Sequence, residues 1–208
     1  QILAYDYKRH ANGQIIVDAA GLPQRGDLIK MGSVLPTLFG GLNNEFNYKA
    51  LNFSFLVDYN FGNKILSATK YYALRRGLDQ ETLEGREGGI ITGVYDNGNQ
   101  NTVAASAQAY YTALANNVTS VTVLNGDYIK LRQMTLGYTL GQRVVAPLKI
   151  FSGIQITLVG RNLAVLMKKS DNIDPEANFA SNIRYTGIEG TSLPSTRSYG
   201  VNINFRFK

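Results

Sequence analysis

The side chains best suited to binding a metal ion lie in one acidic segment near the C-terminus. Asp171, Asp174 and Glu176 are close together there, with Asn172 and Asn178 among them. Ca²⁺ binds carboxylate and amide oxygens of this kind. The spacing does not follow the EF-hand loop, so these three carboxylates are a calcium candidate beside the interpretation that we favour, a structural loop.

Catalytic chemistry has few candidates. His10 is the only histidine, and it lies in a polar segment in a chain without a Gly-x-Ser-x-Gly nucleophile elbow. The absence of cysteine excludes disulfides and thiolate chemistry. Gly40–Gly41 and Gly88–Gly89 lack the Lys-Ser/Thr that completes a P-loop. We therefore predict no enzyme activity, no catalytic residue and no cofactor.

A set of tyrosines could contact a ligand or a partner protein. Tyrosine has an apolar ring and a polar hydroxyl, and it can stack on a sugar or anchor a partner. The candidates are Tyr71, Tyr72, Tyr110, Tyr111 and Tyr185. We expect at least half of them to pack within their own loops instead.

Composition narrows the class of protein. The chain has 208 residues, 44% hydrophobic but only 17% charged, against about 25% charged in typical globular domains. Its net charge of +6 is spread over single residues and pairs, whereas nucleic-acid binding needs a concentrated basic stripe. No apolar run approaches the roughly 18 residues of a membrane helix. A transmembrane β-barrel needs no such run, because only alternate residues of its strands need be apolar.

The last eleven residues alternate strictly between apolar and small, polar or charged side chains. The apolar members are Tyr199, Val201, Ile203, Phe205 and Phe207. Such alternation predicts a strand with one apolar face, and about 9–11 residues are enough for a tilted membrane-spanning strand. An aromatic-rich strand of this kind is typical of the closing strand (198–208) of an outer-membrane barrel. A soluble edge strand is the alternative.

Two further segments predict hairpins of long strands. In 36–65 the alternation turns near Lys49–Ala50, and in 123–163 it turns through Gly141–Pro147. The apolar residues change parity near Arg132, which predicts a β-bulge there or an end of the strand that stands beyond the bilayer.

Longer, irregular segments separate these strands. We predict external loops at 1–35, 66–122 and 164–197, because outer-membrane barrels have short periplasmic turns and longer external loops. The C-terminus is then periplasmic. Helices are expected at Ser67–Leu78 and Val103–Asn116. In the first loop, Leu3–Lys8 and Gln14–Val17 predict a short hairpin, and 21–32 a loop.

Five strands cannot close a barrel. An open sheet would leave unpaired edges in lipid, which is energetically forbidden, and the smallest such barrels have about eight strands. We therefore expect an all-β fold in which 1–208 is the C-terminal part of a larger barrel. The start at Gln1, without a signal-peptide pattern, predicts a processed chain or a piece of a longer one.

Four segments in this order resemble the C-terminal end of SusC/RagA-family TonB-dependent transporters of Bacteroidetes-type bacteria. They are Gly32–Tyr48 (GSVLPTLFGGLNNEFNY), Asn125–Leu140 (NGDYIKLRQMTLGYTL), Val159–Leu163 (VGRNL) followed by Asp174–Glu176, and Leu193–Phe207 (LPSTRSYGVNINFRF). The departures are small. Asn125–Asp127 replaces the family's Ala-Ser, Asn202 stands where the closing strand would have Gly, and Lys208 follows the terminal aromatic residue.

The resemblance implies a plugged barrel of about 22 strands that imports glycans, oligopeptides or other large nutrients, powered through TonB. A SusD-like surface lipoprotein would cover it, and the plug and the TonB-contacting segment would lie outside this chain. Outer-membrane lipid would surround the barrel. Phe205 and Phe207 would form the signal that the barrel-assembly machinery recognises.

Two other interpretations remain open at this point. A soluble β-sandwich that binds carbohydrate would bury the apolar faces against a second sheet within the chain. A complete small barrel with a structural or adhesive role would need at least three further strands from 1–35 and 66–122.

Overall fold

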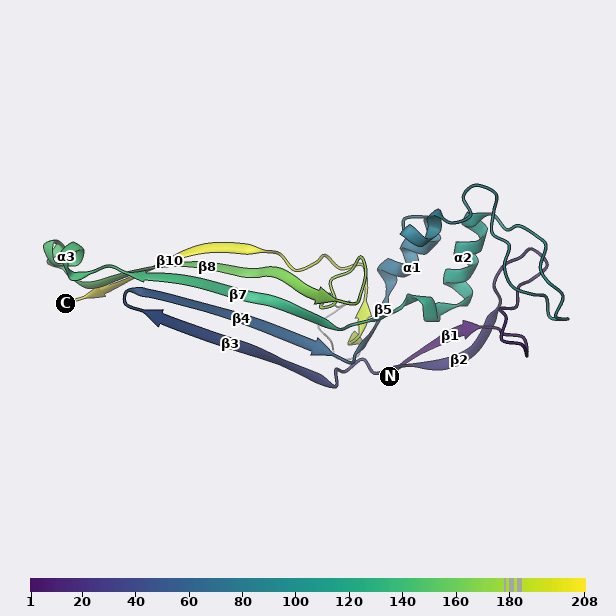
Figure 1. The fold of residues 1–208 in the computed structure, drawn as a ribbon, viewed down its shortest axis with the longest axis horizontal. Coiled ribbons are helices and arrows are strands. Elements are labelled where there is room, and N and C mark those ends of the chain that lie inside the picture. The colour runs from purple at the N-terminus through teal and green to yellow at the C-terminus, as the bar shows by residue number, and fades with distance from the viewer. Residues whose placement is uncertain (178, 180–181, 183–184) are drawn as a thin grey trace. The chain divides into compact units, whose positions relative to one another are not determined.

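A computed structural model describes residues 1–208 except 178, 180, 181, 183 and 184. The chain divides into two compact units (Figure 1). The sheet unit comprises Thr37–Phe61, Asp127–Lys169 and Pro194–Lys208, and the loop unit comprises Gln1–Pro36, Gly62–Gly126 and Ser170–Leu193. None of the helices in the described part of the chain is both long and apolar enough to cross a membrane.

The sheet unit is one antiparallel sheet of five long strands, so the predicted all-β fold is confirmed. The strands are β3 (Leu38–Tyr48), β4 (Leu51–Phe61), β7 (Tyr128–Thr139), β8 (Phe151–Lys168) and β10 (Ser198–Phe207). Their order across the sheet is β10-β8-β7-β4-β3 (Figure 1). Each strand pairs with its neighbour in the order predicted by two hairpins and a closing strand.

The register aligns the alternating patterns of all five strands. One row of paired residues consists of Phe46, Phe53, Leu136, Leu158 and Val201. The next row consists of Asn47, Asn52, Gly137, Thr157 and Asn202. Because successive side chains of a strand point to opposite faces, the first row lies on one face of the sheet and the second on the other.

The predicted bulge lies at Arg132. In the β4–β7 ladder, Leu56 pairs with Gln133 and Val57 with Leu131, so Arg132 is the extra residue. The bulge reverses the parity of β7 and places Leu131 on the same face as Met134 beyond it. One apolar face therefore continues along the whole strand.

The connections in the sheet unit differ from one another. Lys49, with φ of 54°, and Ala50 form the tight turn between β3 and β4. The β7–β8 connection contains two short helical turns, α3 (Gln142–Val145) and η3 (Ala146–Leu148). Strand β8 continues beyond 163, where the hairpin was expected to end. A second irregularity, with Asn162 at φ 51°, interrupts the alternation there and concealed the rest of the strand.

The start of the loop unit keeps the predicted turn at Asn12–Gly13, where Arg9 and Ile15 form an antiparallel bridge, but not the predicted pairing of Leu3–Lys8 with Gln14–Val17. β1 (Ile2–Tyr7) pairs with β2 (Arg25–Gly32), whereas Gln14–Val17 makes only isolated bridges. The prediction of a loop over 21–32 is therefore wrong for β2. Gly26 was taken as a loop residue, but a Cβ there would lie 2.5 Å from the carbonyl oxygen of Tyr7. This glycine allows close approach of two strands.

The rest of the loop unit combines a small sheet with two helices. β5 (Lys64–Ser67) lies between β6 (Val123–Asn125) and β9 (Ile188–Glu189). The helical elements are α1 (Ala68–Arg75), η1 (Gln80–Leu83), α2 (Ala107–Asn117) and η2 (Thr119–Thr122). Helix α2 begins four residues later than predicted, after its serine cap, and α1 ends three residues earlier than predicted, before Gly77 with φ of 69°. Ser67 accepts from the N–H of Lys70, and Ser106 from that of Ala109.

The core of the loop unit lies around the two main helices. Its buried members are Leu74, Ile90, Tyr111, Leu114, Ala115 and Val118, and Tyr71 and Tyr110 pack against them.

Candidate functional site

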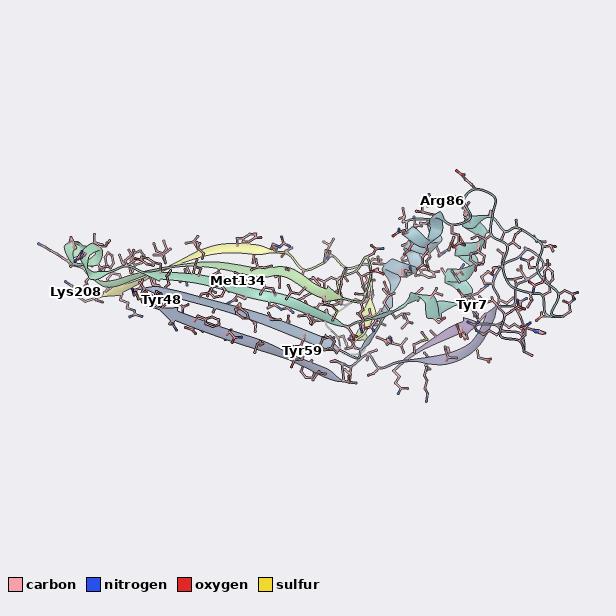
Figure 2. All side chains as sticks on the ribbon, in the orientation of Figure 1. Tyr7, Tyr48, Tyr59, Arg86, Met134 and Lys208 are labelled. Carbon is pink, nitrogen blue, oxygen red and sulfur yellow. The ribbon has the colours of Figure 1, made fainter. Side chains whose placement is uncertain are left out.

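The apolar face of the sheet unit has exposed side chains on each of the five strands, and those of β4 beyond Leu51 are half-buried. Phe46 is 55% exposed, Leu158 53% and Val201 64%. Figure 2 shows Tyr48 near one end of the sheet, Tyr59 near the other and Met134 between them. A continuous apolar surface of this kind marks contact with a membrane or with another protein.

The predicted closing strand contributes its whole apolar set to this face. Tyr199, Val201, Ile203 and Phe205 pair in turn with Gly160, Leu158, Ile156 and Ile154, and Phe207 pairs with Phe151 across a register shift. All five side chains of the set are exposed, by 49% to 74%. The ring of Phe151 lies 5.2 Å from those of Phe205 and Phe207. The strand is thus exposed as a lipid-facing strand would be, and its contact with lipid and its role in assembly stay predictions.

The opposite face carries hydrogen-bonded polar side chains. The side-chain amide of Asn52 donates to Glu45 at 2.6 Å and to Asn47 at 2.7 Å. The hydroxyls of Ser54 and Thr135 are 2.6 Å apart on adjacent strands. These groups suit contact with water, as the interior of a wide barrel requires.

The bulged Arg132 ties three strands together. Its Nε donates to Asp58 on β4 at 2.9 Å, a second guanidinium nitrogen bonds the same carboxylate oxygen, and Nη1 donates to Asn162 on β8 at 3.2 Å. Asp58 and Asn162 lie on the strands that flank β7. The change of parity in the sequence located the bulge but gave no signal for these partners.

The five candidate tyrosines fall into two groups. Tyr111 is 6% exposed and its hydroxyl donates to the carbonyl of Glu81 at 2.5 Å. Burial raises the pKa of both Tyr110 and Tyr111. The hydroxyl of Tyr71 donates to Asn116 at 2.9 Å. These three pack within the loop unit, and only Tyr72 and Tyr185, 44% and 42% exposed, have a ring that is substantially open to a ligand.

The acidic segment forms a turn. The Asp174 carboxylate accepts from the N–H of Glu176 at 3.1 Å, and its carbonyl accepts from the N–H of Ala177 at 2.9 Å. Asn178 lies outside the described residues. Among those that are described, no three or more His, Cys, Asp or Glu side chains are grouped so as to hold a metal ion. The turn at Asp174 agrees with a structural loop, and calcium binding by Asp171, Asp174 and Glu176 stays a prediction.

No family model matches the chain. It is 24% identical over 196 residues to TonB-dependent receptor P39 of Formosa agariphila, covering 94% of this chain and 18% of the relative. TonB-dependent receptor P3 of the same organism is 22% identical, covering 92% of this chain and 18% of the relative. The chain is related to the TonB-dependent receptors. The family resemblance predicted from the motifs is therefore confirmed, for a chain that spans about a fifth of these relatives' length.

Solved structures share the fold of this chain. The RagAB peptide importer in its closed-closed state has a TM-score of 0.60 at 16% identity, covering 99% of this chain and 23% of that one. Its open-open state has a TM-score of 0.61 at 16% identity, covering 100% of this chain and 22% of that one.

One buried carboxylate of the loop unit has no sequence motif that predicts it. Glu189 is 1% exposed and accepts from the hydroxyls of Ser67 and Thr69 at 2.7 and 2.9 Å. It also accepts from the N–H of Thr69 at 3.0 Å and of Ser192 at 3.2 Å. Burial alone would raise the pKa of Glu189, but hydrogen bonds from Ser67, from Thr69 and from the backbone of Thr191 together lower it. The carboxylate thereby fastens β9 to the first turn of α1, where negative charge is favourable.

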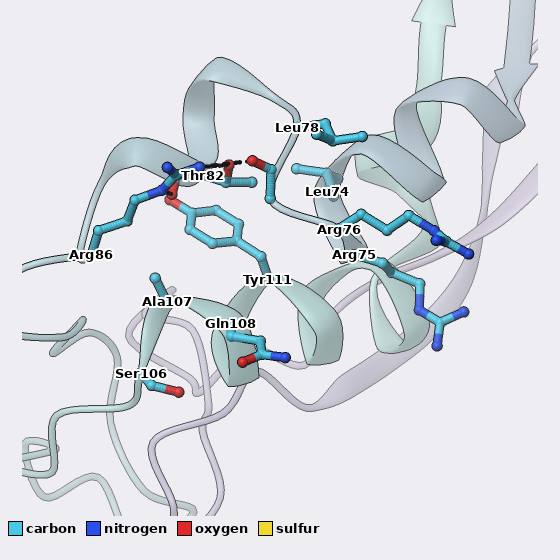
Figure 3. Close-up of a pocket in the computed structure, with 11 residues that line it drawn as sticks. Leu74, Arg75, Arg76, Leu78, Thr82, Arg86, Ser106, Ala107, Gln108 and Tyr111 are labelled. Atoms are coloured by element: carbon cyan, nitrogen blue, oxygen red, sulfur yellow. Dashed lines mark hydrogen bonds between the residues drawn. The ribbon is translucent and has the colours of Figure 1, made fainter.

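A pocket of about 920 Å³ opens in the loop unit between α1, η1 and α2 (Figure 3). Arg75, Arg76 and Arg86 contribute its charged lining, and Leu74, Leu78 and Tyr111 its largest apolar side chains. No sequence motif marks this pocket, because its walls come from three separate elements.

Proposed function

We propose that this chain forms the C-terminal part of an outer-membrane receptor that imports glycans or peptides with energy delivered through TonB. The five-stranded sheet with one exposed apolar face and one polar face carries the proposal. In a transmembrane barrel the apolar face meets lipid and the polar face lines the interior. A receptor of this kind performs no covalent chemistry on its cargo, which agrees with relatives named as receptors and an importer.

The two edges of the sheet support a barrel larger than this chain. Strands β3 and β10 each pair with a single neighbour among the described strands, and backbone groups at such edges need partners in a bilayer. Strands from the rest of the receptor would supply them. The chain covers only 18% of the length of each curated relative. The rest of a receptor of that length can contain these strands, a plug and a TonB-contacting segment.

The chain segments that make up the loop unit support the proposed topology. The three segments predicted as external loops from their length, 1–35, 66–122 and 164–197, nearly coincide with the three pieces of this unit. We therefore assign the loop unit to the cell surface. The turn at Lys49–Ala50, the α3–η3 connection and the C-terminus are then periplasmic.

A SusD-like surface lipoprotein is the proposed partner on the outer side. The exposed rings of Tyr72 and Tyr185 are the candidate contacts for it or for cargo. Aromatic rings with a polar hydroxyl are common anchors at interfaces. The peptide named for the RagAB importer makes peptide a proposed substrate class here beside glycan.

The β-sandwich alternative has less support. It requires a second sheet over the apolar face, whereas each of the five strands has exposed side chains on that face. The small-barrel alternative requires further long strands, whereas the other described strands form separate sheets of two and three strands.

Fractionation of the source cells tests the proposed function. An antibody against residues 78–91 is expected to detect an outer-membrane band far above 22.9 kDa that shifts in a gel when the sample is boiled. Disruption of the gene is expected to reduce uptake of labelled oligopeptides or oligosaccharides. A protonophore is expected to reduce the same uptake, because the proposed transport takes its energy through TonB. A soluble band near 22.9 kDa would contradict the proposal.

The proposed assembly signal has its own test. Phe207→Asp in the whole receptor is expected to lower the amount of heat-modifiable barrel, because a charge replaces an aromatic side chain of the closing strand. Arg206→Asp, which places the same charge on the other face, is the matched control. Unchanged barrel after Phe207→Asp would contradict the assembly role.

A further inference from the structure

The pocket of the loop unit carries two arginines without an acidic partner. Arg75 is the last residue of α1 and Arg76 is its C-terminal cap. Both are exposed, and no carboxylate of the described residues forms an ion pair with either. The nearby Asp79 and Glu81 both pair with Lys70 instead, at 2.9 and 2.8 Å. Two positive charges are thus available at the pocket.

Aromatic rings hold these two arginines in place. The guanidinium of Arg75 lies 5.3 Å from the ring centre of Tyr71 and donates to its hydroxyl at 3.1 Å. That of Arg76 lies 6.0 Å from the ring centre of Tyr72. Cation–π contact orients a guanidinium and leaves N–H donors free for a ligand. Arranged side by side, two such groups favour a carboxylate, which arginine binds through two parallel hydrogen bonds.

Arg86 has a different role. It donates to the carbonyls of Gly77 at 2.7 Å and Thr82 at 3.0 Å, so it joins η1 to the turn after α1. Figure 3 shows Arg86 beside Thr82 and Tyr111, and Arg75 and Arg76 projecting together at the other side of the pocket. Arg86 therefore builds the wall, and the other two arginines are the ligand-binding candidates.

The remaining lining favours a polypeptide over a sugar. Leu78 is 77% exposed and offers an apolar contact next to the charges. Tyr111 is the only aromatic residue among the described lining residues, and it is 6% exposed with its hydroxyl already bonded. A sugar ring therefore finds no open aromatic face for stacking within the pocket.

We propose that this pocket binds a peptide segment that combines carboxylates with apolar side chains, with its carboxylates on Arg75 and Arg76. The inference rests on the proposed function for the source of the segment. It is either an imported peptide or an acidic surface loop of the partner lipoprotein, and both present the same chemistry.

Binding by the whole receptor, purified from outer membranes without its lipoprotein, tests the pocket. The probes are fluorescein-labelled heptapeptides that alternate Leu with Asp or Leu with Asn. The receptor is expected to bind the Asp peptide at least tenfold more tightly, with a preference that weakens at high salt. Arg75→Gln/Arg76→Gln is expected to abolish the preference, and Arg75→Lys/Arg76→Lys to retain part of it.

The matched control is Arg143→Gln, which removes an exposed arginine of the sheet unit and is expected to keep the full preference. Heat modifiability of each variant shows that the barrel is intact. Equal affinity for the two peptides in the unsubstituted receptor, or an unchanged preference in the Gln variant, overturns the proposal. Either result leaves the proposed function standing if the receptor remains a heat-modifiable outer-membrane barrel.

Two further measurements identify the source of the peptide segment. Reduced co-purification of the lipoprotein with the Gln variant supports a partner loop as the occupant. Unchanged co-purification with slower uptake of the Asp peptide by cells supports cargo as the occupant. No change in either measurement overturns a role for the pocket in the cell.

Discussion

The sheet unit and the loop unit differ in the burial of their apolar side chains. Among the described residues, fourteen of the seventeen buried apolar side chains belong to the loop unit, and the sheet unit has Tyr128, Val145 and Ile154. The long strands instead display Phe46, Leu158 and their neighbours. One unit thus contains its own core, whereas the apolar face of the other has to be covered by something outside this chain.

The difference arises from pattern rather than composition. In the sheet unit the apolar residues recur at every second position, so one whole face becomes apolar. In the loop unit they converge from α1, α2 and the intervening segments into one cluster. The same residue types therefore give an exposed apolar face in one unit and a buried core in the other. Substitutions in each unit test this contrast.

Leu74→Ala is expected to have the largest effect, confined to the loop unit. Leu74 is 1% exposed within the core, and such truncations cost about 2–5 kcal/mol. Hydrogen exchange in the assembled receptor should show faster exchange across α1 and α2, with the barrel still heat-modifiable. Leu78→Ala, at a position that is 77% exposed, is the control and should leave exchange unchanged. Equal effects of the two substitutions would argue against a separate core.

Leu136→Arg is expected to affect the sheet unit instead. Leu136 lies on the central strand of the apolar face, and arginine on the lipid face of a transmembrane barrel costs up to about 2–4 kcal/mol, the most at the bilayer midplane. The denaturant midpoint of the barrel refolded in lipid should fall. Thr157→Arg, on the opposite face in the adjacent row, should change it little. A larger loss for Thr157→Arg would reverse the assigned faces.

Glu189→Gln is expected to weaken the attachment of β9 to α1. Hydrogen bonds to a charged group contribute about 1.5–3 kcal/mol, and four donors surround this carboxylate. Because its pKa is lowered in the folded state, its stabilisation is present above the unfolded pKa and is lost as pH falls through the folded pKa.

Proteolysis of the loop unit as a function of pH measures this effect. The unsubstituted receptor should become more susceptible in acid, and Glu189→Gln should be susceptible already at neutral pH with a flatter profile. Glu87→Gln, an exposed position, is the control. A parallel acid profile in Glu189→Gln would exclude Glu189 as the titrating group.

Asp58→Asn is expected to have the smallest effect. The Arg132–Asp58 pair is partly exposed, with side chains 28% and 24% accessible, and such pairs contribute about 1 kcal/mol or less. The midpoint in lipid should fall slightly, less than for Leu136→Arg, and should depend on salt. A loss as large as that of Leu136→Arg would mean that the bulge, rather than the apolar face, controls barrel stability.

Much of the sheet unit was predictable because its signal is local. Alternation located all five strands, and a change of parity located the Arg132 bulge. Strand β2 was missed because Gly26 permits a close approach of strands that looks like a loop signal in the sequence. The far end of β8 was missed because the irregularity at Asn162 interrupts the pattern.

The loop unit was predictable only in part because its contacts are remote in sequence. Glu189 and Ser67 are 122 residues apart, and no spacing rule connects them. The tyrosines were proposed from exposure that the sequence cannot reveal, and Tyr111 proved to be a core residue. Arg75 and Arg76 became a candidate binding site only once the structure showed the pocket that α1, η1 and α2 form.

The most direct test of the proposed orientation is quenching by lipid of a fluorophore on each face of the sheet. This segment has no cysteine, so bimane can be attached to a cysteine that replaces Leu158 or, in a second variant, Val159, in the whole receptor reconstituted with lipids brominated in their acyl chains. The account predicts strong quenching at 158 and little at 159. Equal quenching, or stronger quenching at 159, would contradict a lipid-facing apolar surface.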